Sequence, residues 1–181
     1  MPGRIPDEHV VTFCRTDETM ADATAEYLLG VIRHGGAGVA VVTPAHARQI
    51  DERIAEAGFD PLVARAGGGY VFVDARAAVG QVLPRGWPDP GAFWRTMSPV
   101  IQRAGHGGQR PVRVCGEMVS LLWQTGGFAA AMEAEALWNE LARQYRVGLL
   151  CAYVGTPGAE PDPDDDLALL LAAHTRIAVS P

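Results

Sequence analysis

The chain contains no lysine, and all of its basic residues other than the histidines are arginines. This absence excludes Schiff-base chemistry on a lysine and the lysine that holds phosphates in a P-loop. No apolar run reaches the roughly 18 residues of a transmembrane helix, and residues 1–11 lack the long apolar segment of a signal peptide. No CxxC or HxxxH spacing occurs, so the sequence predicts no metal site.

Cysteine and basic charge are scarce as well. The three cysteines are an odd number and lie far apart, which favours a reduced, cytoplasmic protein without a disulfide framework. The net charge of -6 and the lack of a dense arginine stripe argue against direct binding of nucleic acid.

What is present suits one globular domain. The 181 residues suffice for a substantial core, and 48% hydrophobic with 20% charged residues is a globular composition. No repeat or linker divides the chain, so a single domain over residues 1–181 is expected.

Short apolar runs alternate with helical patterns along the chain. We expect buried strands at 9–14, 38–43, 70–75, 110–115 and 147–153, and an edge strand at 176–180. We expect helices at about 17–34, 44–57, 92–108, 128–145 and 167–174, a helical end to the stretch 112–123, and loops at 83–91 and 155–166. Wholly apolar strands between helices predict an α/β fold with a mainly parallel sheet of five to six strands flanked by helices.

The candidate ligand-binding residues are those expected near the carboxyl ends of the strands, where ligands of open α/β sheets bind. Most would give the pocket a soft, apolar lining, while His46 and Glu117 would supply orienting hydrogen bonds. The alternative for each cysteine is a plain buried hydrophobic residue. The set comprises Cys14, Thr43, His46, Cys115, Glu117, Trp123, Cys151 and Tyr153.

His46 and Glu117 are the polar members with the clearest signals. His46 would be the third residue of its helix, where the helix dipole favours the neutral imidazole; the alternative is a surface or capping histidine. Glu117 follows an apolar strand, where burial of a carboxylate without partners is costly. It is expected to face a ligand or a polar network, or else to be a helix N-terminal charge.

Glu135 and Asn139 lie four residues apart on the apolar face of the helix expected at 128–145. Buried polar groups need partners, so these two either line a pocket or tie the helix to a neighbouring segment. We favour the structural tie. His9 and His174 have no partner at motif spacing and are expected to be structural.

Several phrases of the sequence resemble, in order and spacing, the MEDS family, the methanogen/methylotroph, dichloromethane-repressor sensory domain. They span about residues 9 to 176: "HVVTFCRTDE", "GVAVVTPAHARQIDERIAEAGFD", "VRVCGEMVSLLW", "AEALWNELARQYRVGLLCAY" and a closing His174. The resemblance implies a three-layer RecA-like sandwich, akin to the KaiC ATPases, that has lost its nucleotide machinery. The segment "CRTDETM" stands where a Walker A loop would be, without glycine or lysine to hold phosphates.

The resemblance also implies the sensing of small ligands, with Glu117, Glu135, Asn139 and His46 at family-type positions. We therefore expect a non-catalytic, cofactor-free regulatory module for signal transduction and transcription, which binds a small apolar or weakly polar ligand. No output domain is recognisable, so signalling is expected to pass to a separate kinase, anti-sigma factor or transcription regulator, or through a homo-oligomer. Movement of 83–91 or 155–166 would carry the signal.

Two alternatives remain. The first is an enzyme in which the cysteines, His46 and Glu117 form a nucleophile–base set, although their sequence spacing gives no support for that geometry. The second is a protein-interaction module with Trp87, Phe93 and Trp94 exposed on its contact surface.

Overall fold

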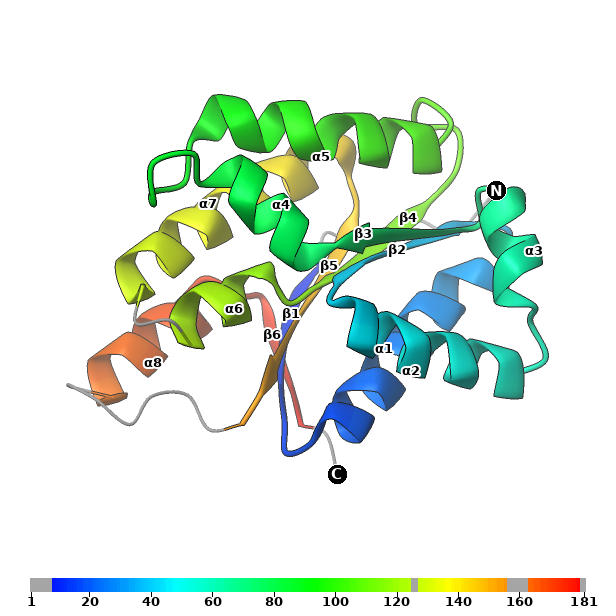
Figure 1. The fold of residues 1–181 in the computed structure, drawn as a ribbon, viewed down its shortest axis with the longest axis horizontal. Helices are drawn as coiled ribbons and strands as arrows, with labels where there is room; N and C mark the ends of the chain where they lie inside the picture. The colour runs from blue at the N-terminus through cyan, green and yellow to red at the C-terminus, as the bar shows by residue number, and fades with distance from the viewer. Residues whose placement is uncertain (1–7, 125–126, 156–162, 180–181) are drawn as a thin grey trace.

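A six-stranded parallel sheet runs through the centre of the protein (Figure 1). The computed structural model describes residues 8–124, 127–155 and 163–179. The strands lie in the order β3-β2-β4-β5-β1-β6, and every neighbouring pair is parallel. Their bounds are β1 His9–Cys14, β2 Ala37–Val42, β3 Tyr70–Asp74, β4 Val112–Gly116, β5 Gly148–Val154 and β6 Arg176–Val179.

Helices cover both faces of this sheet (Figure 1), which confirms the predicted three-layer α/β architecture. One layer holds α1 (Asp17–Ile32), α2 (Pro44–Glu56) and α3 (Pro61–Ala66). The opposite layer holds α4 (Ala75–Val82), α5 (Pro90–Ala104), α6 (Met118–Gln124), α7 (Phe128–Tyr145) and α8 (Pro163–Ala172).

Most strand positions are apolar because both faces of the sheet are covered. Within β2, Val39 and Val41 contribute to the core under α4–α8, whereas Ala40 and Val42 contribute to the core under α1 and α2. The sheet thus separates two hydrophobic cores. Among the described residues no helix is both long and apolar enough to cross a membrane.

Side-chain caps fix where several helices begin. Thr16 caps α1 in a reciprocal capping box with Thr19, and Thr43 caps α2, in which Pro44 takes the first helical position. Both starts agree with the sequence-based prediction.

Two short helices were not predicted, α3 and α4. Asp60 accepts hydrogen bonds from the first backbone amides of α3, and Asp74 does the same for α4. These helices have only 6 and 8 residues, too few for a clear helical periodicity, so the caps are their main signal.

Pro99 lies inside α5, which is continuous, and Gly116 is the last residue of β4. The expected exposure of Phe93 was wrong. Phe93 is fully buried, with its ring edge-to-face on Trp138, although Trp87 is exposed as expected and Trp94 is half-buried. Most of the loop predicted at 155–166 lies outside the described residues.

Candidate functional site

The carboxyl ends of β2 and β4 form a topological switch point. The two strands are neighbours, but α2 follows β2 into one helical layer while α6 follows β4 into the other (Figure 1). Adjacent strands whose connections leave in opposite directions open a crevice at their carboxyl edge, where ligands of α/β proteins bind. Thr43, His46 and Glu117 all lie at this edge.

Glu117 joins the two strands at this carboxyl edge. Its backbone N–H donates to the Val41 carbonyl at 3.0 Å, which extends the β2–β4 ladder by one residue. Its side chain is 5% exposed, and Oε1 accepts the backbone N–H of Thr43 at 2.5 Å. Oε2 forms a short contact with Nδ1 of His46. The carboxylate is therefore buried with both oxygens engaged, at the N-terminus of α2, where the helix dipole favours negative charge.

His46 bridges this buried acid to the surface. Its Nε2 lies 3.3 Å from Oδ1 of Asp17, a residue at the start of α1 that is 59% exposed. The prediction of a neutral imidazole is wrong. The hydrogen bond to Glu117 has the largest effect and raises the pKa of His46. Partial burial lowers it, the charges of Glu117 and Asp17 raise it, and the net result is a raised pKa. The imidazolium is therefore favoured, despite the helix dipole.

The connection between β1 and α1 lies in the place of a phosphate-binding loop. Only Arg15 and Thr16 separate the end of β1 from the start of α1. The Thr16 side chain already binds an N-terminal backbone amide of α1, and Asp17 and Glu18 place negative charge in the first turn. A bound phosphate needs free amides and positive charge at such a terminus.

The three cysteines do not line one pocket, because they are divided between the two faces of the sheet. Cys14 and Cys115 belong to the core under α1 and α2, whereas Cys151 belongs to the core under α7. All three are buried, and none forms a disulfide bond. Burial raises the pKa of Cys115 to about 12, and its sulfur lies 3.1 Å from the Thr24 hydroxyl.

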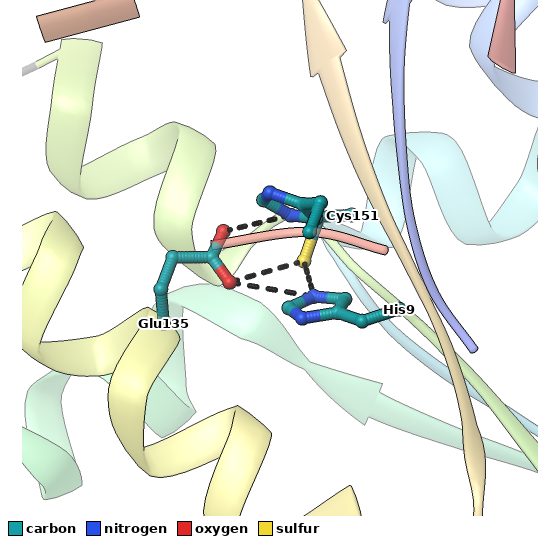
Figure 2. Close-up of side chains that lie close together, drawn as sticks. His9, Glu135 and Cys151 are labelled. Atoms are coloured by element: carbon teal, nitrogen blue, oxygen red, sulfur yellow. Dashed lines mark hydrogen bonds and ion pairs between the residues drawn. The ribbon is translucent and has the colours of Figure 1, made fainter. Parts of the chain in front are cut away.

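A second polar cluster lies between the sheet and α7. Glu135 is fully buried there, and Tyr153 donates a hydrogen bond to its Oε1 at 2.9 Å. Figure 2 shows the side chains of His9, Glu135 and Cys151 converging from β1, α7 and β5. The Nε2 atom of His9 lies 3.1 Å from the sulfur of Cys151 and 3.4 Å from Oε2 of Glu135.

Asn139 supports this cluster from the next turn of α7. Its Oδ1 lies 3.0 Å from Nδ1 of His9, and its Nδ2 donates to the Ala173 carbonyl at 3.1 Å. Glu135 and Asn139 thus tie α7 to β1, β5 and the segment after α8, which is the network role expected for them.

His9 and His174 are the members that the sequence-based prediction missed. Nε2 of His174 lies 3.4 Å from Oε1 of Glu135, and the His9 and His174 rings have centroids 4.1 Å apart. Burial is the main influence on His9 and lowers its pKa, with Glu135 opposing. Burial alone would raise the pKa of Glu135, but the two histidines hold it below its usual value. The alternation in β1, which places His9 on the same side as Val11, was the available signal.

Trp123 and Tyr153 adjoin the second cluster rather than the first. Their rings pack edge-to-face at 5.7 Å, and both contact the core under α6 and α7. Beside them lies an apolar cavity of about 10 Å³, lined in part by Cys151, Met118 and Trp138. A cavity of this volume can hold roughly one water molecule. A groove of about 590 Å³ lies over β1 and β6, and none of the predicted ligand-binding residues lines it.

Comparison with known proteins gives the fold and the family. A KaiC-like protein from the hyperthermophilic archaeon Pyrococcus horikoshii superimposes with a TM-score of 0.64 at 15% identity, covering 96% of this chain and 70% of that one. This similarity shows a KaiC/RecA-like fold. No curated protein matches the chain. The family model described as the methanogen/methylotroph, DcmR sensory domain, MEDS, matches residues 8–175, so the chain belongs to the MEDS family of sensory domains.

Proposed function

We propose that this sensory domain binds a small, apolar or weakly polar ligand without transforming it, at the crevice between β2 and β4. The observation that carries the proposal is the buried Glu117–His46 pair at the topological switch point. Each oxygen of Glu117 contacts the β2–α2 junction, so a ligand that moves His46 also acts on the join between the two strands.

His46 is the group best suited to orient the ligand. Its Nδ1 is held by Glu117, while its Nε2 faces only the largely exposed carboxylate of Asp17 at 3.3 Å. An exposed ion pair of this kind contributes little, so a ligand oxygen can replace Asp17 as acceptor at small cost. A small carboxylic acid, carbonyl compound or alcohol fits this donor.

A nucleotide does not suit the same edge. The two-residue β1–α1 connection is capped by Thr16 and followed by Asp17 and Glu18, which repel phosphate. These features support the loss of an ATPase function. The signal would pass to a separate kinase, anti-sigma factor or transcription regulator.

A thermal-shift panel of small carboxylic acids, small amines and Mg-ATP tests the proposal, since a ligand of the folded state stabilises it by mass action. At least one small compound should raise the Tm of the wild type and of E56Q, a control at an exposed glutamate of α2. The same compound should leave E117Q unshifted, and Mg-ATP should shift none of them. Stabilisation by Mg-ATP, or an equal response of E117Q, would overturn the proposal.

A thiol enzyme is the second candidate, because the sulfur of Cys151 lies 3.1 Å from Nε2 of His9, and Nδ1 of His9 lies 3.0 Å from Oδ1 of Asn139. This is the order of a nucleophile, a base and a group that orients the base. Against it, burial and then Glu135 raise the pKa of the Cys151 thiol, opposite to the usual activation of a catalytic cysteine. Labelling of the folded protein with iodoacetamide separates the two. A sensor should keep Cys151 unlabelled at neutral pH, whereas labelling faster than that of free cysteine would favour the enzyme.

A further inference from the structure

Four potential metal ligands converge in the cluster under α7. They are the imidazoles of His9 and His174, the carboxylate of Glu135 and the sulfur of Cys151, and one ligand atom from each lies within 4.8 Å of all the others. The four come from β1, the segment after α8, α7 and β5. The side chains of Glu135 and His174 are both 0% exposed.

The hydrogen bonds of both imidazoles fix which nitrogen is available. Nδ1 of His174 lies 2.7 Å from the Leu170 carbonyl, which can only accept, so this nitrogen carries the proton. Asn139 donates through Nδ2 to Ala173, so its Oδ1 faces Nδ1 of His9 and accepts from it at 3.0 Å. Both rings therefore turn an Nε2 lone pair toward Glu135.

Nε2 of His9 lies 3.1 Å from the sulfur of Cys151, but Nε2 of His174 is poorly matched to its surroundings. Nε2 of His174 is buried and has no hydrogen-bond partner, although the Glu135 carboxylate lies 3.4 Å away. A lone pair facing a carboxylate is unfavourable unless a proton or a cation lies between them. Histidines that bind metal usually show this pattern, with the other ring nitrogen held by a carbonyl or carboxylate oxygen.

From this arrangement we infer that His9, Glu135, Cys151 and His174 bind one divalent transition-metal ion, with zinc the best match. Bonds of about 2.0–2.3 Å in a tetrahedral site separate the ligand atoms by about 3.3–3.7 Å. Oε2 of Glu135 lies 3.4 Å from Nε2 of His9 and 3.7 Å from the sulfur of Cys151, whereas Nε2 of His174 lies 3.4 Å from the other oxygen, Oε1. Nε2 of His9 and the sulfur of Cys151 are 3.1 Å apart, slightly closer than in a tetrahedral site, so binding requires small movements of these side chains. Two nitrogens and a sulfur exclude the hard ions Mg²⁺ and Ca²⁺, which prefer oxygen ligands.

On binding, Cys151 coordinates as the thiolate and its proton leaves to solvent. The ion would connect four parts of the chain: β1, β5, α7 and the segment that leads into β6. This site shares no residue with the Glu117–His46 pair, and the inference does not rest on the ligand proposed there.

Metal analysis of the full chain, purified without chelator or metal-affinity resin, tests the inference. Titration of the metal-free protein with ZnCl₂ should saturate at one ion per chain. Substitution with Co²⁺ should produce a thiolate-to-cobalt charge-transfer band in the near ultraviolet, which requires a sulfur ligand. This readout needs no variant, so it holds even if a substituted chain folds poorly.

Variants then assign the ligands. C151S should lose the cobalt band and lower zinc affinity at least about tenfold, and N139A, which removes only the support of His9, should lower it about 10–100-fold. C115S is the matched control, a buried cysteine on the opposite face of the sheet, and should keep both band and affinity. Absence of saturable zinc binding, or equal loss in C115S and C151S, would overturn the inference.

Discussion

At the scale of single residues, Glu117 explains why an acid stands at the end of an apolar strand. Its carboxylate accepts a hydrogen bond from the backbone amide of Thr43 and contacts the ring of His46. These two contacts compensate for the free-energy cost of burying the carboxylate. Neither partner is near in sequence, since Thr43 is 74 residues away. Glu117 therefore joins β4 to α2, at the edge of the sheet where we propose that the ligand binds.

Removal of the Glu117 side chain should therefore be costly. E117A leaves the Thr43 amide and the His46 ring without their buried acceptor and should lower the free energy of unfolding by about 3–5 kcal/mol. E117Q keeps an acceptor for Thr43 and should cost less, about 1–3 kcal/mol. Urea denaturation measures both. An E117A cost as small as that of E56A, at an exposed position, would contradict the account.

The raised pKa of His46 predicts a pH dependence of stability. A group whose pKa is higher in the folded than in the unfolded state stabilises most below its unfolded value of 6.5, and that contribution disappears as the pH rises through the folded-state pKa. The difference in unfolding free energy between wild type and H46Q should therefore be largest below pH 6.5 and shrink at higher pH. Glu117 and Asp17 are the charged groups that raise the pKa of His46. Denaturation curves of both proteins across this pH range measure this difference. A difference in unfolding free energy that grows with pH would contradict the prediction.

At the scale of elements, α7 is the helix that organises the second cluster. Glu135 and Asn139, on its buried face, connect it to β1, β5 and the segment after α8. Asn139 contacts both His9 in β1 and the backbone after α8, so it links the first strand to the last segment. The edge strand β6 follows that segment directly.

Loss of this link should loosen the C-terminal elements. N139A removes the hydrogen bonds of Asn139 to the Ala173 carbonyl and to Nδ1 of His9. The free energy of local opening should fall by about 1–3 kcal/mol, so amides of α8 and β6 should exchange hydrogen faster. Q144A, on the exposed side of the same helix, should exchange like the wild type. Faster exchange confined to α7 itself would show that Asn139 does not hold the segment.

At the scale of the whole molecule, the sheet order brings distant residues into two polar sites. Gly116 in β4 is the register partner of Cys151 in β5, so the residue before Glu117 pairs with a member of the second cluster. The two sites thus share neighbouring strands within a KaiC/RecA-like fold.

The same order marks the limit of prediction from sequence. Apolar strands alternating with helical patterns predicted the α/β architecture. Their polar neighbours and the two polar residues on the apolar face of α7 singled out Glu117, His46, Glu135 and Asn139 individually. Their pairing was not predictable, because it depends on which strands are neighbours. His9 and Cys151 lie 142 residues apart and meet only because β1 pairs with β5. The three cysteines, which sequence position grouped together, are separated by the alternation of strand faces.

Native mass spectrometry of the freshly purified chain tests the central claim, a sensory domain that retains a small ligand at the β2–β4 crevice in place of a nucleotide. The account predicts an adduct smaller than a nucleotide on the wild type and on E56Q, and its loss from E117Q. A retained ATP or ADP, or an adduct held equally by E117Q, would contradict it.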